Sequence, residues 1–338
     1  MNRGSEQKVS VLGGGSWGTA LAKVLADKGD PVSLWCRREE VATDINRDRV
    51  NRHYLPGATL PSELTATHNI QESLENASMV VFVSPSHGTR DVAREAKRFV
   101  PKGVPIVSAT KGIENESLMF IDEILASELP DVKDQLAFLS GPSFAKELAA
   151  GLPTGVVIAA KDKGTRDIVM RRFHAPHLRT YGSDDVVGVE CGGALKNVIA
   201  IAAGVCDGLG LGHNTRSMLI TRGLAEIARL SIARGGQALT LAGLAGMGDL
   251  VLTCTGDLSR NRTVGFELGR GRTLSDILEG LGHVAEGVKT TKSAYDLSIK
   301  LSVDMPIVQE MYAILYEQKP VKDALRDLMG RELVSEFL

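Results

Sequence analysis

The sequence predicts an α/β protein in which a doubly wound, mainly parallel sheet is followed by an all-α C-terminal domain. Two observations predict this class. Up to about residue 181, short unbroken apolar runs alternate with helical patterns, as in a parallel sheet covered by helices on both faces. Beyond that point, long helical patterns rich in Ala, Gly and Leu replace the apolar runs. A chain of 338 residues is long enough for roughly two domains.

The first domain, residues 1–188, is expected to hold the sheet. Its apolar runs have the length of buried strands, and the segments between them have helical periodicity. The strands are expected at residues 9–12, 31–36, 79–83, 104–109, 136–139 and 156–160. The clearest helices are expected at residues 19–28, 89–99 and 117–128.

The second domain, residues 189–338, is expected to be helical. Residues 189–205 are almost wholly apolar, which indicates a helix buried on all sides. Ligands of a doubly wound sheet bind outside the carboxyl ends of its strands, so we expect this domain to close over that crevice. Further helices are expected at residues 215–234, 273–281, 288–301 and 307–316.

A glycine-rich segment follows the first expected strand. Its first, third and sixth residues are Gly13, Gly15 and Gly18, the fingerprint of dinucleotide binding when it lies between a strand and a helix. These glycines allow a tight turn, close approach of a pyrophosphate, and close packing of helix on strand. The helix N-terminus then offers free N–H groups to the phosphates. This interpretation makes the sheet Rossmann-type; the alternative is a purely structural turn.

Composition limits the class of protein. The formal net charge of −2 gives no global basic field, so we expect no nucleic-acid partner. The four cysteines are widely spaced and contain no C-x-x-C pair, which favours a reducing compartment over disulfides. The polar N-terminus lacks the apolar core of a signal peptide, and no apolar run approaches the ~18–20 residues of a membrane span. We therefore expect a cytoplasmic protein without membrane insertion.

Lys196 lies inside the most apolar predicted helix. No carboxylate stands three or four residues from it, so a helical ion pair is not available. Desolvation would lower its pKa towards the range useful for proton transfer at neutral pH. Asn197 adds a second polar group at the same place. The alternative is a lysine at a helix–helix rim whose ammonium reaches solvent.

Residues 259–262 begin another expected helix, which runs to about residue 268. Ser259 is a suitable N-cap, but Arg260 and Arg262 in the first turn oppose the helix dipole. A bound anion would reverse that penalty, because N–H groups and guanidinium groups would converge on it. The segment therefore predicts a phosphate or carboxylate pocket. The alternative is a solvated basic turn.

Other candidates lie at strand ends. Lys111 follows the strand at 104–109, at the edge where cofactor and substrate should meet, although a surface lysine would fit the same position. Gly141 and Ser143 form a tight turn after another strand and could offer amides and a hydroxyl. The Asp249 carboxylate could orient a lysine or accept from a substrate hydroxyl. Each of these turns alone is compatible with ordinary turn chemistry.

No metal site is expected. The seven histidines form no H-E-x-x-H motif and show no ligand spacing with cysteine. The nucleophile-elbow pattern G-x-S-x-G occurs at residues 14–18. Ser16 belongs to the more specific dinucleotide pattern, however, and no other hydrolase element accompanies it.

Taken together, these segments resemble the bacterial NAD(P)-dependent sn-glycerol-3-phosphate dehydrogenases. They occur in the order of that family and extend over nearly the whole chain. The matching segments are residues 13–18, 109–112, 140–147, 192–197, 246–253 and 259–262.

The resemblance implies reversible oxidation of sn-glycerol 3-phosphate to dihydroxyacetone phosphate by NAD(P)⁺. It implies that the enzyme runs mainly towards glycerol 3-phosphate for glycerophospholipid synthesis and forms a homodimer. By position, Lys196 is the proton acceptor or donor at the C2 oxygen. The implied substrate contacts are Lys111, Gly141, Ser143, Asp249, Ser259, Arg260 and Asn261. The implied cofactor contacts beyond the glycines are Ser16, Trp17, Arg37, Tyr54, Lys111, Ala145, Arg260, Val284 and Glu286.

The end of the second expected strand departs from the NAD-binding pattern. An acidic residue that binds the ribose 2′-hydroxyl is expected about 20 residues after the glycine loop. Here that place holds Arg37 and Arg38, with Glu39 only afterwards. Two arginines suit a 2′-phosphate, which favours NADP(H), with NAD(H) also possible. Two rival functions are another β-hydroxyacid-type dehydrogenase and a non-catalytic NAD(P)-binding regulator.

Overall fold

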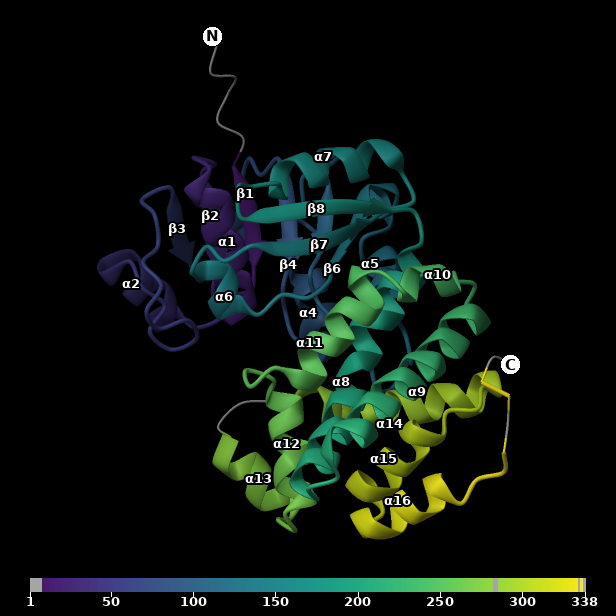
Figure 1. Cartoon of the computed structure of the whole chain (residues 1–338). Helices are drawn as coiled ribbons and strands as arrows, with labels where there is room; N and C mark the ends of the chain where they lie inside the picture. Colours follow the sequence, from purple (N-terminus) through teal and green to yellow (C-terminus); the bar gives the residue numbers. More distant parts are fainter. Residues whose placement is uncertain (1–7, 282–284, 334, 337–338) are drawn as a thin grey trace.

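The sheet of the first domain has eight strands among the residues described in the computed structural model, which are 8–281, 285–333 and 335–336 (Figure 1). The strand order is β3-β2-β1-β4-β5-β6-β7-β8. All neighbours are parallel except β6 and β7, which confirms the predicted fold class. The strands are β1 Val9–Leu12, β2 Val32–Trp35, β3 Leu64–Thr67, β4 Met79–Phe82, β5 Ile106–Ser108, β6 Leu136–Ser140, β7 Thr154–Ala159 and β8 Leu178–Ser183.

The two strands that the sequence analysis did not predict, β3 and β8, are the edges of the sheet. An edge strand is partly solvated and does not need a continuous apolar run. β3 reads Leu-Thr-Ala-Thr, and only the first residue of β8 is buried. The six predicted strands are confirmed, with ends that differ by at most two residues.

Helices cover both faces of the sheet. Val9 and Val11 of β1 pack into the core on one face, and Leu12 packs into the core on the other. Helices α1, α2, α6 and α7 contribute buried or packed side chains to the first core, and α3, α4 and α5 to the second. These helices are α1 Ser16–Asp27, α2 Glu39–Asp48, α3 Ile70–Leu74, α4 Ser86–Ala96, α5 Ile121–Glu128, α6 Ala145–Ala149 and α7 Lys163–Phe173, with a 3₁₀ turn at Pro130–Gln135.

The order of the strands reverses between β1 and β4, so the crevice at the carboxyl ends of the strands lies there. Gly13 follows β1 and has a φ of 143°. A Cβ at this position would lie 2.5 Å from the carbonyl oxygen of Val83, just after β4. A Cβ on Gly18 would lie 1.9 Å from the carbonyl oxygen of Gly13. Glycine is therefore required sterically at both positions of this turn.

The helical domain is built around α8 (Figure 1). This helix packs against α9, α11, α12 and α14. It begins three residues after β8 ends and is longer than expected. The helices are α8 Val186–Gly208, α9 Gly212–Ala233, α10 Ala238–Leu241, α11 Asp249–Thr255, α12 Arg260–Gly269, α13 Leu274–Leu281, α14 Glu286–Leu301, α15 Pro306–Tyr316 and α16 Val321–Met329, with a π-helical turn at Leu244–Gly248.

The length of α8 corrects one expectation. At 23 residues, with a mean hydropathy of 1.5 over its most apolar stretch, it is long and apolar enough to cross a membrane. The expectation that no segment approaches this length was therefore wrong. However, 89% of that stretch is buried inside the protein, which is the property of a core helix.

Glycines allow α8 and α12 to cross in close contact. A Cβ on Gly204 would lie 2.0 Å from the carbonyl oxygen of Arg262. A Cβ on Gly265 would lie 1.8 Å from that of Ile201. Because the backbones touch here, the start of α12 is held beside the middle of α8.

Candidate active site

One buried carboxylate joins two lysines from different parts of the chain. Asp249, the first residue of α11, is 1% exposed. Its Oδ1 accepts a hydrogen bond from Lys196 of α8, and its Oδ2 accepts one from Lys111 at 2.6 Å. Lys111 lies in the loop after β5, so Asp249 links the sheet domain to the core helix of the second domain.

The surroundings of Lys196 suit proton transfer. Burial is the largest influence and lowers the pKa of Lys196 to about 8. The Asp249 carboxylate opposes this effect, and the Lys111 ammonium adds to it. A lysine in this range can be neutral or charged near neutral pH. Its carboxylate partner comes from 53 residues away, which helical spacing could not reveal.

Lys111 is fixed by the turn after β6. Its Nζ donates to the carbonyl oxygen of Gly141 at 3.1 Å, and Ser143 Oγ donates to the same oxygen at 2.9 Å. Gly141 adopts a φ of 130°, which glycine tolerates best. On the other side, Thr110 Oγ1 donates to the carbonyl oxygen of Ser84, after β4, at 2.8 Å. The loops at three neighbouring strand ends are thus tied together around Lys111.

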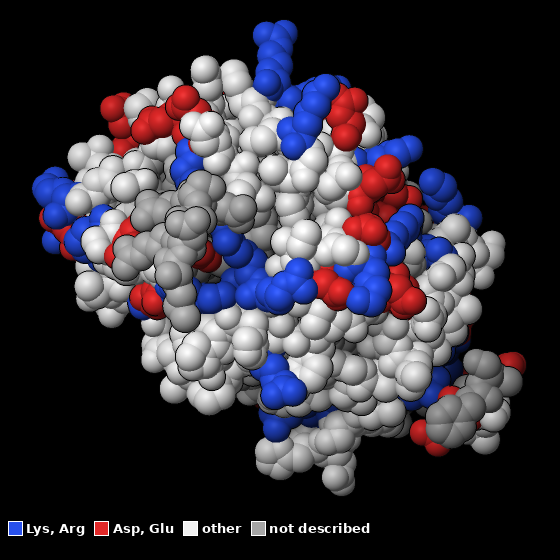
Figure 2. All heavy atoms as spheres, turned by 90° about the horizontal axis from the view of Figure 1, so that it is seen from above, with Lys and Arg blue, Asp and Glu red and all other residues white. Residues whose placement is uncertain are grey.

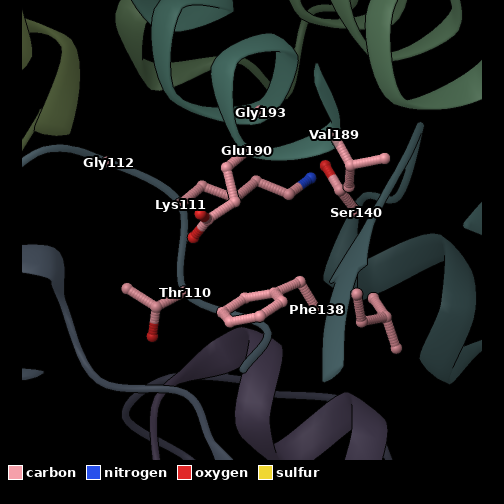
Figure 3. A pocket seen from close by; sticks show the side chains of 9 residues that line it. Thr110, Lys111, Gly112, Phe138, Ser140, Val189, Glu190 and Gly193 are labelled. Atoms are coloured by element: carbon pink, nitrogen blue, oxygen red, sulfur yellow. The ribbon is translucent and has the colours of Figure 1, made fainter. Parts of the chain in front are cut away.

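Lys111 lines a small pocket (Figure 3). The lining also includes Ser140, Glu190 and Gly193. Ser140 Oγ is buried and has no hydrogen-bond partner among the described residues. Burial raises the pKa of Glu190 well above its ordinary value, and the neighbouring Asp122 adds to this effect. Ser140 begins the matching segment 140–147 but was not predicted as a site residue, and Glu190 stands in no recognisable motif.

Gly193 sets how closely α8 approaches this pocket. A Cβ at this position would lie 2.8 Å from Ser140 Oγ and 3.4 Å from Cγ of Lys111. A side chain at this position would therefore push against the Ser140 hydroxyl and crowd the Lys111 side chain. Gly193, in the segment 192–197, therefore lets α8 pack closely against Ser140 and Lys111.

The start of α12 has the predicted N-cap, but its arginine contacts differ from those that the sequence predicted. Ser259 Oγ accepts from the backbone N–H of Arg262 at 3.3 Å. The guanidinium of Arg262 pairs with Asp207 at 2.9 Å and with Asp257 at 3.0 Å. The expectation that both arginines converge on an anion was therefore wrong for Arg262. Arg260 is exposed and forms no ion pair with the described residues.

Asn261 connects α12 to α8 and α14. Its Nδ2 donates to Asn197 Oδ1 at 2.9 Å, and its Oδ1 accepts from the backbone N–H of Gly287 at 2.9 Å. These bonds hold the first turn of α12 beside Asn197, the neighbour of Lys196 on α8. The polar pair Lys196–Asn197, noted in the sequence, is thus one side of a cross-helix network.

Glu286 begins α14 and is electrically coupled to the same cations. Burial raises its pKa, whereas Arg260, Lys196 and Lys111 act to lower it. These groups therefore belong to one electrostatic neighbourhood built by both domains. Val284, the other candidate contact in this segment, lies outside the described residues.

The glycine turn has the features that a dinucleotide needs. A Cβ on Gly15 would have nothing within 4 Å, so the space beside it is open. No side chain caps the N-terminus of α1, which leaves its N–H groups for a ligand. Trp17 Nε1 is buried without a partner among the described residues, and Ser16 Oγ donates to the carbonyl oxygen of Tyr54 at 2.5 Å. The residues present fit a bound pyrophosphate.

The two arginines after β2 are exposed but differ in their contacts. Arg38 Nη2 donates to the Tyr54 hydroxyl at 3.2 Å, and its guanidinium carbon lies 5.4 Å from the centre of the Tyr54 ring. Arg38 also lies 3.5 Å from Glu40. Arg37 forms no ion pair with the described part of the chain. Ala145, the first residue of α6, packs against the core on the α1 face.

Charge elsewhere on the molecule is mixed. On the face drawn in Figure 2, acidic side chains lie next to basic ones, in line with the net charge of −2. Within the described ranges, no three His, Cys, Asp or Glu side chains group as metal ligands. All four cysteines are free and buried.

Comparison with known proteins gives a consistent result over nearly the full length. A family model described as NAD-dependent glycerol-3-phosphate dehydrogenase N-terminus matches residues 8–166, and the corresponding C-terminus model matches residues 185–326. Glycerol-3-phosphate dehydrogenase (NAD(P)+) of Leptospira biflexa is 52% identical over 330 residues, which cover 97% of this chain and 99% of the relative. The same-named protein of Citrifermentans bemidjiense is 52% identical over 331 residues, 98% of this chain and 99% of the relative.

Solved structures agree with these matches. The crystal structure of glycerol-3-phosphate dehydrogenase from Coxiella burnetii has a TM-score of 0.92 and 39% identity, covering 96% of this chain and 99% of that one. A ketopantoate reductase from Ralstonia eutropha matches with a TM-score of 0.60 and 17% identity, covering 91% of this chain and 97% of that one. At that identity the second match shows the fold alone.

Proposed function

The chain belongs to the NAD-dependent glycerol-3-phosphate dehydrogenase family, and from this premise we propose which of its residues carry out each part of the reaction. The protein is an oxidoreductase that interconverts sn-glycerol 3-phosphate and dihydroxyacetone phosphate with NAD(P)⁺ and NAD(P)H. The rival functions, another β-hydroxyacid-type dehydrogenase or a non-catalytic regulator, are not favoured. We assign cofactor binding mainly to residues 1–188 and catalysis and substrate binding mainly to residues 189–338.

Lys196 is the proposed proton acceptor during oxidation of the substrate. That reaction removes a hydride from C2, which bound nicotinamide accepts, and a proton from the C2 hydroxyl. Neutral Lys196 takes the proton, and charged Lys111 stabilises the negative charge that develops on the oxygen. Asp249 keeps the two amines together. The observation that carries this proposal is the bridge from Asp249 to both lysines.

The substrate phosphate is proposed to bind at the start of α12. Arg260 has no ion pair with the described residues there, and the N-terminus of a helix favours a bound anion. Asn261 and Ser259, the N-cap of α12, shape this end of the site. Gly141, whose carbonyl oxygen accepts from Lys111 and from Ser143, completes the proposed substrate contacts together with Ser143.

The dinucleotide is proposed to lie along the glycine turn. Gly15 leaves open space for the pyrophosphate, and Gly13 and Gly18 allow the tight turn and the close packing of α1 beside it. Arg37 and Arg38 support a preference for NADP(H), because cations there suit a 2′-phosphate, while NAD(H) is also used. The further proposed contacts are Ser16, Trp17, Tyr54, Lys111, Ala145, Arg260, Val284 and Glu286.

The cellular setting is also a proposal. Four free, buried cysteines support a reducing compartment, and we infer a cytoplasmic location. We further infer that the enzyme forms a homodimer and runs mainly towards glycerol 3-phosphate, which feeds glycerophospholipid synthesis.

The direct test follows NAD(P)H absorbance when dihydroxyacetone phosphate is added to the purified protein. Oxidation of both cofactors is expected, with a higher kcat/KM for NADPH than for NADH. No oxidation of either cofactor would contradict the activity. A clear preference for NADH would contradict the proposed role of Arg37 and Arg38 and leave the reaction standing.

A further inference from the structure

Asn51 is a buried asparagine outside all the segments discussed above. It follows α2, in the connection to β3, and is 1% exposed. Its Nδ2 donates to the carbonyl oxygen of Gly14 at 2.9 Å and to Thr19 Oγ1 at 2.8 Å. Its Oδ1 accepts from the backbone N–H of Tyr54 at 3.1 Å. Both donors and the acceptor of this amide are therefore used.

These three bonds join the glycine turn to a segment far away in the sequence. Gly14 lies in the turn itself, and Thr19 lies in the first turn of α1. A second link runs the other way, because Ser16 Oγ donates to the carbonyl oxygen of Tyr54 at 2.5 Å. The backbone N–H of Leu55 also bonds the carbonyl oxygen of Asn51, at 2.9 Å. Residues 51–55 and the glycine turn thus form one hydrogen-bonded unit.

The same unit extends to Arg38, after β2. The Tyr54 hydroxyl accepts from Arg38 at 3.2 Å, and the guanidinium lies over the Tyr54 ring. Asn51 bonds the Tyr54 backbone N–H, and Ser16 bonds the Tyr54 carbonyl oxygen. Both bonds therefore connect the glycine turn to this partner of Arg38.

We propose that Asn51 is a positioning residue for the adenosine end of the dinucleotide: it holds Tyr54, and through it Arg38, at the distance from the glycine turn that a ribose 2′-phosphate requires. The proposal rests on the proposed cofactor contacts of Arg38 and Tyr54. Asn51 itself need not touch the cofactor. Its effect is therefore expected on the difference between NADPH and NADH, because only NADPH carries the 2′-phosphate.

Asn46 provides a matched control from the same part of the chain. It lies on α2, and its side chain exchanges two hydrogen bonds with the backbone of Ala66 in β3, at 2.7 and 2.8 Å. It therefore holds an edge strand to a helix, and within the part of the chain that the structure describes it makes no hydrogen bond to the glycine turn. Loss of Asn46 removes a comparable number of hydrogen bonds without changing the link to Tyr54.

The test uses full-length Asn51→Ala, Asn51→Asp, Asn46→Ala and Arg38→Ala proteins. The dissociation constants of NADPH and NADH are measured by titration calorimetry, alongside the melting temperature and kcat at saturating cofactor. For both Asn51 variants we expect Kd for NADPH to rise roughly tenfold, the equivalent of one or two lost hydrogen bonds. Kd for NADH should rise less, so that the preference for NADPH shrinks, while kcat is retained. Asn46→Ala should lower the melting temperature and leave the preference unchanged.

The outcomes separate this proposal from the one it rests on. If Arg38→Ala reduces the preference for NADPH but neither Asn51 variant does, Asn51 is structural only and the proposal is overturned. If no variant changes the preference for NADPH, the proposed contact between Arg38 and the 2′-phosphate is wrong. The proposal for Asn51 is then overturned with it. Should Asn51→Ala not fold, Asn51→Asp decides the matter, since it keeps the shape and the acceptor for the Tyr54 amide.

Discussion

Lys196 and Glu226 are two ionisable side chains of the helical domain. Both are buried, but they differ in their hydrogen-bond partners. Lys196 is 9% exposed and Glu226 is 1% exposed. Burial lowers the pKa of Lys196 to about 8 and raises the pKa of Glu226 to about 7. Lys196 shares the carboxylate of Asp249 with Lys111. Glu226 instead accepts from the backbone N–H groups of Ile307, at 2.7 Å, and Val308, at 3.2 Å.

The difference teaches that a shifted pKa does not by itself mark a reactive group. Both oxygens of Glu226 accept hydrogen bonds from backbone N–H groups at the start of α15. These N–H groups have no partner within the helix, so the Glu226 side chain supplies one. That arrangement is structural. Lys196 has a side-chain partner that reaches a second lysine and the strand ends. The partners, rather than the burial, assign the function.

The largest expected effect comes from Lys196→Ala. Removal of a positioned proton acceptor should lower kcat by roughly 10²–10⁴-fold, because no side chain is then in place to accept the proton of the C2 hydroxyl. Steady-state kinetics with both cofactors measure this, and the melting temperature shows whether the fold is kept. A kcat near that of the wild type would remove Lys196 from the mechanism.

The two arginines at the start of α12 also differ in their partners, and we expect a smaller effect of their substitution. Arg260 has no ion pair with the described residues, whereas Arg262 is paired with Asp207 and Asp257. Arg260→Ala should raise KM for glycerol 3-phosphate by roughly 10- to 100-fold, since hydrogen bonds to charged groups contribute about 1.5–3 kcal/mol. Its kcat should change little. Arg262→Ala is the control, and an equal effect of both substitutions on KM would break the distinction.

Glu226→Gln should change the pH dependence of stability and leave kcat unchanged. The folded protein keeps the Glu226 proton up to about pH 7, whereas the unfolded chain releases it near its ordinary pKa of 4.5. The unfolded state therefore binds fewer protons between these values, and the wild type loses stability as pH rises. Glutamine keeps an acceptor without this loss, which amounts to at most about 3 kcal/mol. Melting temperatures of both proteins from pH 4.5 to 7.5 provide the measurement; parallel curves would be the contrary result.

The sequence predicted those parts of the molecule that depend on local pattern. Central strands such as β1 and β4 are buried on both faces and appear as apolar runs, whereas the edge strands β3 and β8 do not. Lys196 stood out because it interrupts an apolar helix. Its contact with Asp249 depends on how α11 packs against α8, which no local pattern encodes. Asn51 carried no signal, since the partners of its Nδ2, the Gly14 carbonyl oxygen and the Thr19 hydroxyl, are more than 30 residues away.

The central claim is that burial and Asp249 together set the protonation of Lys196, and the pH dependence of kcat/KM for glycerol 3-phosphate oxidation tests it most directly. Because neutral Lys196 accepts the proton, the rate should rise with pH around a midpoint of about 8. In Asp249→Asn the carboxylate that raises the pKa of Lys196 is gone, so the midpoint should move to lower pH. An unchanged midpoint in this variant would contradict the claim.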